Sequence, residues 1–332
     1  MTGNDTIRVL VLGGAGMIGR KLAGRLAAEG IGRPIGELVL HDLVEATGME
    51  APFPVRALTG TIADPAEANR LAVLRPDVVF HLAAIVSGDA EANFDKGWDV
   101  NARGSWHLFE ALRAEHLASG GAYVPRVVFA SSIAVYGPPF PEKIGDDFLT
   151  APQTSYGAQK AMTELLLADY SRKGFVDGIS IRLPTICVRP GKPNLAASSF
   201  FSGIIREPLN GQEAILPVAD TVRHWHASPR SAARFLTHAA TLDTARLAGR
   251  RSLAMPGVSC TVAEQIEALR AVAGEAAVKL IRRVPDERIA RIVGGWPRDF
   301  DPVAARSLGF TAEESFAEII RIHIEDDRPR TV

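Results

Sequence analysis

The sequence predicts an α/β fold in which a doubly wound parallel sheet is followed by a smaller C-terminal domain. Short aliphatic runs alternate with stretches typical of helices through the first half of the chain, and these runs are continuously apolar. Strands with that pattern belong to parallel sheets that are covered on both faces. At 332 residues, the chain is long enough for one large domain or two unequal ones.

The first expected strand, Ile7–Leu12, leads directly into a glycine turn and then a helix. The turn has the spacing G-x-x-G-x-x-G, formed by Gly13, Gly16 and Gly19. Glycines allow a tight turn and a close approach of the backbone to a pyrophosphate, which binds at the N-terminus of the following helix. The order of strand, turn and helix therefore favours a dinucleotide site over a simple turn with no ligand.

The second expected strand, at 37–40, is followed by His41 and Asp42. Asp42 comes roughly 20–30 residues after the glycine turn, where a carboxylate accepts hydrogen bonds from both ribose hydroxyls of NAD. The same carboxylate repels the 2′-phosphate of NADP, so we predict NAD as the cofactor. A solvated loop carboxylate without a ligand is the alternative interpretation of Asp42.

The alternation of strands and helices continues to residue 130. We expect further strands at 55–58, 77–84 and 126–130, and helices at 65–74 and 91–116. The strand at 77–84 ends in small residues, which would allow a flat cofactor to lie close. Because ligands of such sheets bind at the carboxyl ends of the strands, we expect the glycine turn, Asp42, Ala83 and Ser132 to lie near one another.

A tyrosine and a lysine follow the fifth strand with a spacing that suits proton transfer. Tyr156 and Lys160 are four residues apart, so in a helix they project from one face about one turn apart. A neighbouring ammonium favours the phenolate and lowers the pKa of a tyrosine from its usual value of about 10. The fifth strand ends in Ser131 and Ser132, either of which can hold a substrate oxygen against Tyr156. The same spacing also occurs in ordinary surface pairs.

The composition argues against several classes of partner. The chain has 37 basic and 38 acidic residues, which argues against nucleic acid or an anionic membrane as the main partner. No apolar run approaches the roughly 20 residues of a membrane helix, and the N-terminus lacks a signal-peptide pattern. The two cysteines, Cys187 and Cys260, are too few for a disulfide framework and suit a reducing compartment. We expect a soluble, cytoplasmic protein.

Several motifs resemble, in the same order, those of the extended short-chain dehydrogenases/reductases, the group of NAD-dependent epimerases and dehydratases. They are Val11–Gly19, His81–Ala84, Val100–Ser105, Ser131–Gly137, Tyr156–Lys160 and the closing segment Asp301–Phe310. The resemblance implies a Rossmann-type nucleotide domain, with Tyr156 as the catalytic acid/base and Lys160 as its partner and a ribose ligand. It implies that Ser132 orients the reacting oxygen, with the adjacent Ser131 as the rival for this role.

The resemblance also implies the residues that bind NAD. These are Gly13, Gly16, Met17, Ile18, Asp42, Thr61, Ile62, Leu82, Ala83, Ala84, Asn101, Tyr156, Lys160 and Pro184. Two interpretations of Asn101 remain open: a link in a proton relay from Lys160 to water, or a helix residue whose side chain is satisfied locally. By the same analogy we expect a homodimer, in which the helices near 101–114 and 156–170 of two chains pack together.

Three departures from the family pattern argue against a nucleotide sugar as the substrate. Leu12 precedes the glycine motif where the family usually has Thr. Thr185 stands where nucleotide-sugar enzymes commonly have an Asn that touches the pyrophosphate. The stretch 223–230 is a shortened form of the family's Arg-Asp-Tyr/Phe-Ile-His-Val-x-Asp segment and lacks its Asp.

Basic and hydroxyl side chains replace these features. A carboxylate is well held by a bidentate arginine, and the candidate cations are Arg182, Arg189, Lys192, Arg223 and Arg230. Arg189 and Arg223 are our first choices, and ordinary salt bridges are the alternative for each cation. We expect the substrate to contact Ser87, Ser132, Thr185, Arg189, Ser198 and Arg223.

The stretches 182–194, 198–208 and 224–231 resemble a branch of the family that oxidises the C2 hydroxyl of a four-carbon sugar acid with NAD. We therefore predict a dehydrogenase of a small sugar acid. A nucleotide-sugar epimerase or dehydratase that retains NAD is the first alternative. A non-catalytic dinucleotide sensor is the second, although it has no need of Ser132, Tyr156 and Lys160 together.

We assign residues 1–178 to NAD binding and residues 179–332 mainly to substrate binding, with some later elements returning to the sheet. His224 and His226 have the spacing of a metal-ligand pair, but no third ligand is evident and hydride transfer needs no Lewis acid. We expect no metal and assign both histidines to packing or hydrogen bonding. Cys187 follows an apolar strand and is expected to be buried rather than nucleophilic.

Overall fold

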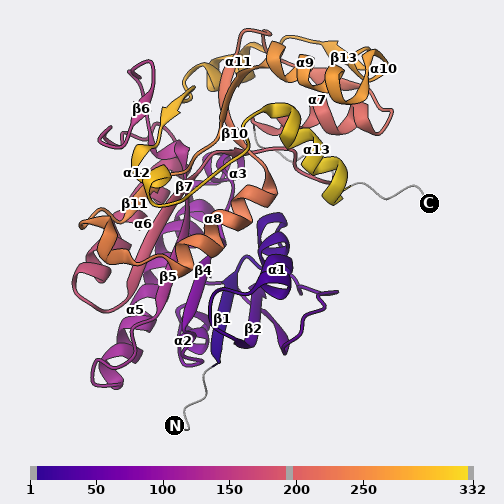
Figure 1. The fold of residues 1–332 in the computed structure, drawn as a ribbon. Helices are drawn as coiled ribbons and strands as arrows, with labels where there is room; N and C mark the ends of the chain where they lie inside the picture. The colour runs from indigo at the N-terminus through magenta and orange to yellow at the C-terminus, as the bar shows by residue number, and fades with distance from the viewer. Residues whose placement is uncertain (1–5, 192–196, 328–332) are drawn as a thin grey trace. The chain divides into compact units, whose positions relative to one another are not determined.

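The computed structural model describes residues 6–191 and 197–327, which form two compact units (Figure 1). The first unit comprises the described residues up to 135 together with 152–182 and 233–253. The second comprises 136–151, 183–232 and the described residues from 254 onward. Each unit is thus built from separate stretches of sequence. The assignment of NAD binding to 1–178 and of substrate binding to 179–332 remains a prediction.

The first unit alternates strands and helices, as its sequence predicts. Its complete elements are β1 (Ile7–Leu12), α1 (Met17–Glu29), β2 (Ile35–Asp42), β3 (Val55–Thr59), α2 (Pro65–Ala72), β4 (Val78–His81), α3 (Ser87–Ala92), α4 (Phe94–Gly97), the π-helix η1 (Trp98–Arg103), α5 (Gly104–Ala118), β5 (Arg126–Ser132), the 3-10 turn η2 (Ile133–Val135), α6 (Ser155–Arg172) and the 3-10 turn η3 (Thr244–Leu247). Three elements cross between the two units along the chain: β7 (Asp177–Leu183), α8 (Pro229–Thr241) and β11 (Ser252–Ala254).

A seven-stranded sheet in the order β11-β7-β5-β4-β1-β2-β3 forms the centre of the first unit. The pairs β2–β3, β1–β2, β1–β4 and β4–β5 are parallel. Nearly every residue of β1 and β4 is buried, because helices cover both faces. On one face, α2, α5 and α6 pack on the strands through side chains such as Leu71, Phe109 and Leu167. The predicted α/β, Rossmann-type fold is confirmed.

Two expected boundaries in the first unit were wrong. β4 ends at His81 rather than at Ala84, because the chain leaves the sheet once the Leu82 amide has donated to the Leu12 carbonyl. The helix expected at 91–116 is interrupted: Asn93 has non-helical dihedrals, and the π-helix η1 lies between α4 and α5. π-Helical turns occur frequently at functional sites, and this one contains Asn101.

The second unit contains three small sheets and the helices packed against them. The sheets have the orders β12-β10-β8, β13-β9 and β14-β6. Its complete elements are β6 (Ile144–Gly145), β8 (Thr185–Ile186), α7 (Ser199–Leu209), β9 (Ala214–Leu216), β10 (Arg223–Ala227), β12 (Val258–Thr261), α9 (Val262–Ala273), α10 (Glu275–Val278), β13 (Ile281–Arg283), α11 (Glu287–Gly294), β14 (Phe300–Asp301), α12 (Val303–Ser307) and α13 (Phe316–Asp327). Its core includes Phe201, Ile266 and Ile320, from α7, α9 and α13.

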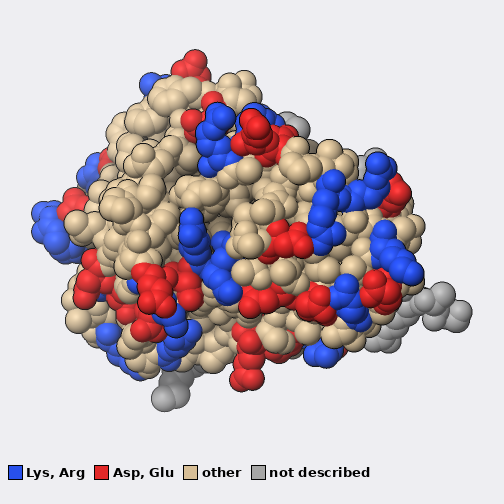
Figure 2. Space-filling model, turned by 90° about the horizontal axis from the view of Figure 1, so that it is seen from above, with Lys and Arg blue, Asp and Glu red and all other residues tan. Residues whose placement is uncertain are grey.

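Charged side chains of both signs are interspersed over the face seen in Figure 2, which suits the near-neutral composition. Within residues 6–191 and 197–327, no helix has the length and apolar character that a membrane crossing requires.

The glycine turn is closely packed on two sides. Gly13 has a φ of +84°, and a Cβ built there would lie 2.9 Å from the Ala83 amide nitrogen, in the loop after β4. A Cβ on Gly19 would overlap the Gly13 carbonyl oxygen, so the first turn of α1 starts directly against the glycine turn. By contrast, a Cβ on the exposed Gly24, farther along α1, would meet nothing within 4 Å. Glycine is therefore required at the start of this helix and not in its middle.

We expect Gly19→Ala to lower the free energy of unfolding by about 2 kcal/mol or more, because the atoms that the added methyl group meets are backbone. Gly24→Ala, the matched control, should raise stability by about 0.5–1 kcal/mol through its higher helix propensity. Urea unfolding followed by circular dichroism measures both changes. Equal effects of the two substitutions would contradict the packing described here.

Candidate active site

Helix α6 carries Tyr156 and Lys160 on one face, as the four-residue spacing predicts. The helix begins after Thr154, whose hydroxyl accepts a hydrogen bond from the Gly157 amide at 3.1 Å. Lys160 is 3% exposed, whereas Tyr156 is only half-buried. The Lys160 amine lies 5.6 Å from the centre of the Tyr156 ring. The two side chains are therefore close enough for the charge of the amine to act on the phenol.

Two contacts hold the beginning of α6 against the end of β5. The Lys160 amine donates to the Ala130 carbonyl oxygen at 2.8 Å. A Cβ on Gly157 would overlap the Ala134 carbonyl oxygen, so the helix backbone approaches the turn after β5 very closely. Ala130 and Ala134 lie two residues before and two residues after Ser132. The Tyr156 end of α6 is thus packed beside the segment that carries Ser132.

The neighbouring serines differ in what their hydroxyls do. The Ser131 hydroxyl is buried and donates to the Glu164 carboxylate at 2.5 Å. The Ser132 oxygen is half-buried and accepts from the Ala134 amide at 3.1 Å, which leaves its proton available for another acceptor. Ser132 is therefore the better placed of the two to hold a substrate oxygen.

Burial determines the electrostatics of the Lys160 amine. It lowers the pKa of Lys160 to about 7, while the Glu164 carboxylate acts in the opposite direction. The amine also lies 4.5 Å from the centre of the Phe129 ring, which favours a cation. The nearby His81 is fully buried and has its pKa lowered to about 3, so it is neutral at physiological pH. Lys160 therefore changes charge near neutral pH, and the groups around it decide which form is present.

The predicted dinucleotide residues at the ends of β1 and β2 lie together. The Asp42 carboxylate accepts from the Ala15 amide at 3.0 Å and from the Leu43 amide at 2.7 Å, so it is fixed beside the glycine turn. The Gly13 and Gly14 amides donate to the His41 carbonyl at 2.8 and 3.1 Å. Among the described residues, no side chain caps the N-terminus of α1. This turn, which an added Cβ would fill, fits a pyrophosphate, with Met17 and Ile18 in the first turn of α1.

Asn101 is held by local hydrogen bonds. Its amide nitrogen donates to the Ile85 carbonyl at 3.0 Å and to Gln159 at 2.8 Å, and its oxygen accepts from the Ile85 amide at 2.8 Å. These contacts favour the interpretation of a locally satisfied side chain. They also stabilise the loop after β4, which contains Leu82, Ala83 and Ala84, because two of them join Asn101 to Ile85.

Other predicted cofactor and substrate residues of the first unit lie in loops or at the first turn of a helix. The Thr61 hydroxyl accepts from the Ala63 amide at 3.3 Å. Ile62 is buried, and a Cβ on Gly104 would lie 2.9 Å from its side chain. Ser87 begins α3, within the same unit. Among the described residues, no contact of these three side chains indicates a bound ligand.

The Thr185 hydroxyl donates a hydrogen bond to a histidine, and both residues belong to the second unit. The Thr185 oxygen is 2.6 Å from Nε2 of His224, and Nδ1 of the same ring is 3.1 Å from the Pro297 carbonyl oxygen. A carbonyl only accepts, so Nδ1 carries the proton and Nε2 accepts from Thr185. Burial lowers the pKa of His224 to about 4, which keeps the ring neutral. Thr185 can therefore offer only lone pairs to another group.

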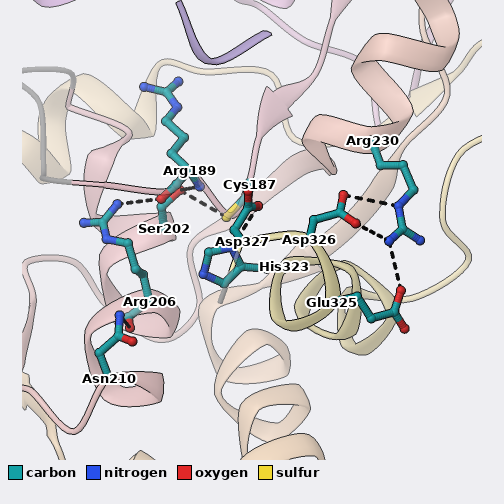
Figure 3. Close-up of polar contacts among 10 residues, drawn as sticks. All are labelled: Cys187, Arg189, Ser202, Arg206, Asn210, Arg230, His323, Glu325, Asp326 and Asp327. Carbon is teal, nitrogen blue, oxygen red and sulfur yellow. Dashed lines mark hydrogen bonds and ion pairs between the residues drawn. The ribbon is translucent and has the colours of Figure 1, made fainter. Parts of the chain in front are cut away.

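Most of the candidate cations are already paired with carboxylates. Arg182 contacts Glu164 at 2.6 Å, and Arg223 contacts Glu264 at 3.3 Å. Arg230 contacts Glu325 at 2.9 Å and Asp326 at 2.5 Å, as Figure 3 shows.

Arg189 contacts a backbone carbonyl oxygen. Its Nε donates to the Ile186 carbonyl at 3.3 Å, and its guanidinium points away from Ser202 and Arg206 in Figure 3. Lys192 lies outside the described residues. Ser198 directly precedes α7, and Pro184 lies between β7 and β8.

The two histidines proposed for packing or hydrogen bonding are buried. His226 Nε2 is 2.7 Å from the Gln265 amide, and the His224 ring stacks on Phe201 with centroids 5.1 Å apart. Cys187 is also buried, and burial raises the pKa of its thiol to about 11. In residues 6–191 and 197–327, no group of three or more His, Cys, Asp or Glu side chains is placed to hold a metal ion.

Sequence reasoning missed the role of Glu164, the buried carboxylate that joins Ser131 to Arg182. Its position four residues after Lys160 was the available signal, because that spacing repeats the one between Tyr156 and Lys160. An isolated glutamate on a helix is usually solvated, so the pattern alone did not single it out.

The lowered pKa of Lys160 predicts a specific dependence of stability on pH. Between pH 7 and about 10, the unfolded chain binds a proton at Lys160 that the folded chain does not, so this residue makes stability rise with pH by about 1.4 kcal/mol per unit. We expect Lys160→Met to remove that part of the slope. Guanidinium unfolding at pH 7, 8 and 9 measures it, with the exposed Lys173→Met as the control. An unchanged slope in Lys160→Met would show that the amine keeps its proton in the folded protein.

Comparison with known proteins agrees with this fold. Residues 9–241 match the model of the NAD dependent epimerase/dehydratase family. A D-erythronate dehydrogenase of Cupriavidus necator is 47% identical over 96% of this chain and 98% of its own. One from Haemophilus influenzae is 40% identical over 97% and 100%. A crystal structure described as the nucleoside-diphosphate-sugar epimerase of Agrobacterium tumefaciens is 55% identical, covers 98% of this chain and 97% of its own, and has a TM-score of 0.93. The chain belongs to the NAD-dependent epimerase/dehydratase family and is an NAD-dependent oxidoreductase.

Proposed function

We propose that the protein is a dehydrogenase that uses NAD to oxidise the C2 hydroxyl of a small sugar acid, D-erythronate, to 2-oxo-tetronate. The observation that carries the proposal is the buried Lys160 amine, 5.6 Å from the Tyr156 ring and anchored to the end of the strand that carries Ser132. This arrangement suits removal of a proton from an alcohol. The dehydrogenases that share 40–47% identity with the chain support the choice of substrate class.

Each side chain of the proposed site has a separate role in the oxidation. Bound NAD supplies the acceptor for the hydride that leaves C2. Tyr156 takes the proton of the C2 hydroxyl, and Ser132 hydrogen-bonds to the same oxygen and holds it where charge develops. Lys160 stabilises the Tyr156 phenolate when its amine is charged. Asp42, beside the glycine turn, accepts from the ribose hydroxyls, and Gly13, Gly16 and Gly19 keep the turn open for the pyrophosphate.

The direction of the hydrogen bond between Thr185 and His224 favours a sugar acid over a nucleotide sugar as the substrate. An asparagine at this position would offer N–H donors to a pyrophosphate. Thr185 donates its proton to His224, so it can only accept, and an anionic phosphate oxygen has no proton to give it. A substrate hydroxyl is a suitable donor. We therefore propose that Thr185 accepts a hydrogen bond from a hydroxyl of the sugar acid, with Arg189 and Arg223 as the candidates for its carboxylate.

A nucleotide-sugar epimerase that retains NAD is the second candidate function. The Agrobacterium tumefaciens structure, at 55% identity, is described by such a name, but the relatives at 40–47% identity are named D-erythronate dehydrogenases, and we favour the dehydrogenase. The two candidates differ in a simple observable, because a dehydrogenase releases reduced cofactor in every turnover and an epimerase does not.

The decisive assay follows NADH at 340 nm with NAD and a panel containing D-erythronate, other aldonic acids, UDP-sugars and GDP-sugars. We expect steady NADH formation with one or more four-carbon sugar acids and none with the nucleotide sugars. Tyr156→Phe should lower the turnover number by at least about 100-fold, since general base catalysis contributes that much, and should leave NAD binding intact. Epimerisation of a nucleotide sugar without NADH release would refute the substrate, and an active Tyr156→Phe would refute the base.

We also propose that the protein is a cytoplasmic homodimer. Trp106 on α5 and the α6 residues Met162 and Leu165 are apolar and exposed, Leu165 by 72%, on the two helices expected at the interface. The two cysteines are free and buried, as suits a reducing compartment.

Leu165→Glu should therefore convert a dimer to a monomer, because it places a charge within the proposed interface. Leu149→Glu, at a leucine of the second unit that is 82% exposed, is the matched control and should leave the assembly unchanged. Light scattering coupled to size exclusion measures both masses. A monomeric wild-type protein would contradict the proposal.

A further inference from the structure

A buried network of charges continues from Lys160 along α6 and is not used by the mechanism proposed above. Glu164 is 3% exposed, and its carboxylate accepts from the Ser131 hydroxyl at 2.5 Å. The Arg182 guanidinium donates to both of its oxygens, from Nε at 2.9 and 3.1 Å and from Nη2 at 2.6 Å. α6, β5 and β7 each contribute one member of the network.

This carboxylate has the partners that a buried negative charge needs. Moving an isolated carboxylate out of water is costly, so a buried one needs a cation and hydrogen bonds in good geometry. Arg182 supplies a planar, multiply bonded contact, and Ser131 supplies a hydroxyl proton. Glu164 is also four residues after Lys160, on the same side of the helix. A fixed negative charge thus lies about one helical turn from a buried amine.

In the described part of the chain, the other groups packed against the Lys160 amine bring no permanent negative charge. Ala130 and Phe129 on β5 offer a carbonyl oxygen and a ring face, and His81 on β4 is neutral. Tyr156 is one turn before it on α6. Among the described residues, the electrostatic effects resolved on Lys160 are burial, which disfavours its charge, and Glu164, which favours it.

We propose that Glu164 is a positioning residue for the reaction: it favours the charged form of the Lys160 amine beside Tyr156 near neutral pH, while Arg182 and Ser131 hold the Glu164 carboxylate in the interior. The inference rests on the proposed function in one respect, that turnover requires the charged amine. It assigns Ser131 a different task from Ser132, although the two serines are adjacent. It also removes Arg182 from the cations available to a substrate carboxylate.

Substitutions of Glu164 and of Arg182 should shift the alkaline limb of the pH profile in opposite directions. Glu164→Gln leaves the buried Lys160 amine and the partly buried Arg182 guanidinium without an anion, so Lys160 should lose its proton at lower pH. We expect the alkaline limb of the pH profile of kcat/KM to move down by about one unit, and the maximum to fall about tenfold, as for the loss of a unit charge from a partly buried site. Arg182→Gln removes the cation that offsets Glu164 and leaves Ser131 and the Lys160 amine as the partners of its carboxylate, so the limb should move up. The double variant should return the limb to the wild-type position.

The experiment measures kcat/KM for NADH formation from pH 6 to 10 in the wild type and the three variants. Asp177→Asn is the matched control, because it breaks the ion pairs with Arg126 and Arg251 at the other end of β7. It should lower stability without moving the profile. Circular dichroism and NAD binding establish that each variant is folded.

The inference is overturned if the two single variants move the limb in the same direction or not at all, or if the double variant is no closer to the wild type than Glu164→Gln. Such results would make the network purely structural. If Glu164→Gln does not fold, the upward shift in Arg182→Gln and its reversal in the double variant still decide the question. Failure of the proposed function is separate, because it appears as an absence of NADH formation by the wild type on every sugar acid.

Discussion

The burial of one amine constrains much of this site. Lys160 is removed from water, and burial lowers its pKa to about 7. The pKa of such a buried amine depends strongly on every nearby dipole and charge, because the surrounding protein screens charges weakly. The Ala130 carbonyl, the Phe129 ring and the Glu164 carboxylate therefore do more than fill space. Each favours the cation, and together they oppose the desolvation that removes it.

Close backbone packing supplies the precision that these electrostatic effects need. The approach of Gly157 to Ala134 brings α6 against the turn after β5, and the approach of Gly13 to Ala83 brings the glycine turn against the loop after β4. Asn101 fixes that loop from the π-helix η1. A tyrosine can act on a substrate only if the helix, the strand end and the cofactor turn keep their spacing, and glycine allows backbones to approach without side chains between them.

The sequence predicted the parts of the fold that depend on local pattern. Ile7–Leu12 is the strand that its apolar run predicts, and Tyr156 and Lys160 share a helix as their spacing requires. The end of β4 and the interruption by η1 were missed, because hydrogen bonds between residues far apart in sequence override local preference there. The Leu82 amide donates to the Leu12 carbonyl, and the Asn101 side chain donates to Gln159. The direction of the Thr185 hydrogen bond was also beyond reach, since it depends on a carbonyl at Pro297. Ser131 and Ser132 look alike in sequence, and only Glu164 distinguishes them.

The strand β11 has a consequence for how the chain is made. It lies at the edge of the seven-stranded sheet, next to β7, yet it is formed by Ser252–Ala254, long after the other strands have been synthesised. A nascent chain that has emerged only as far as α6 contains Tyr156 and Lys160 but lacks two strands of the sheet, β7 and β11. The first unit therefore reaches its full set of strands only after the whole intervening segment of the second unit, 183–232, has left the ribosome.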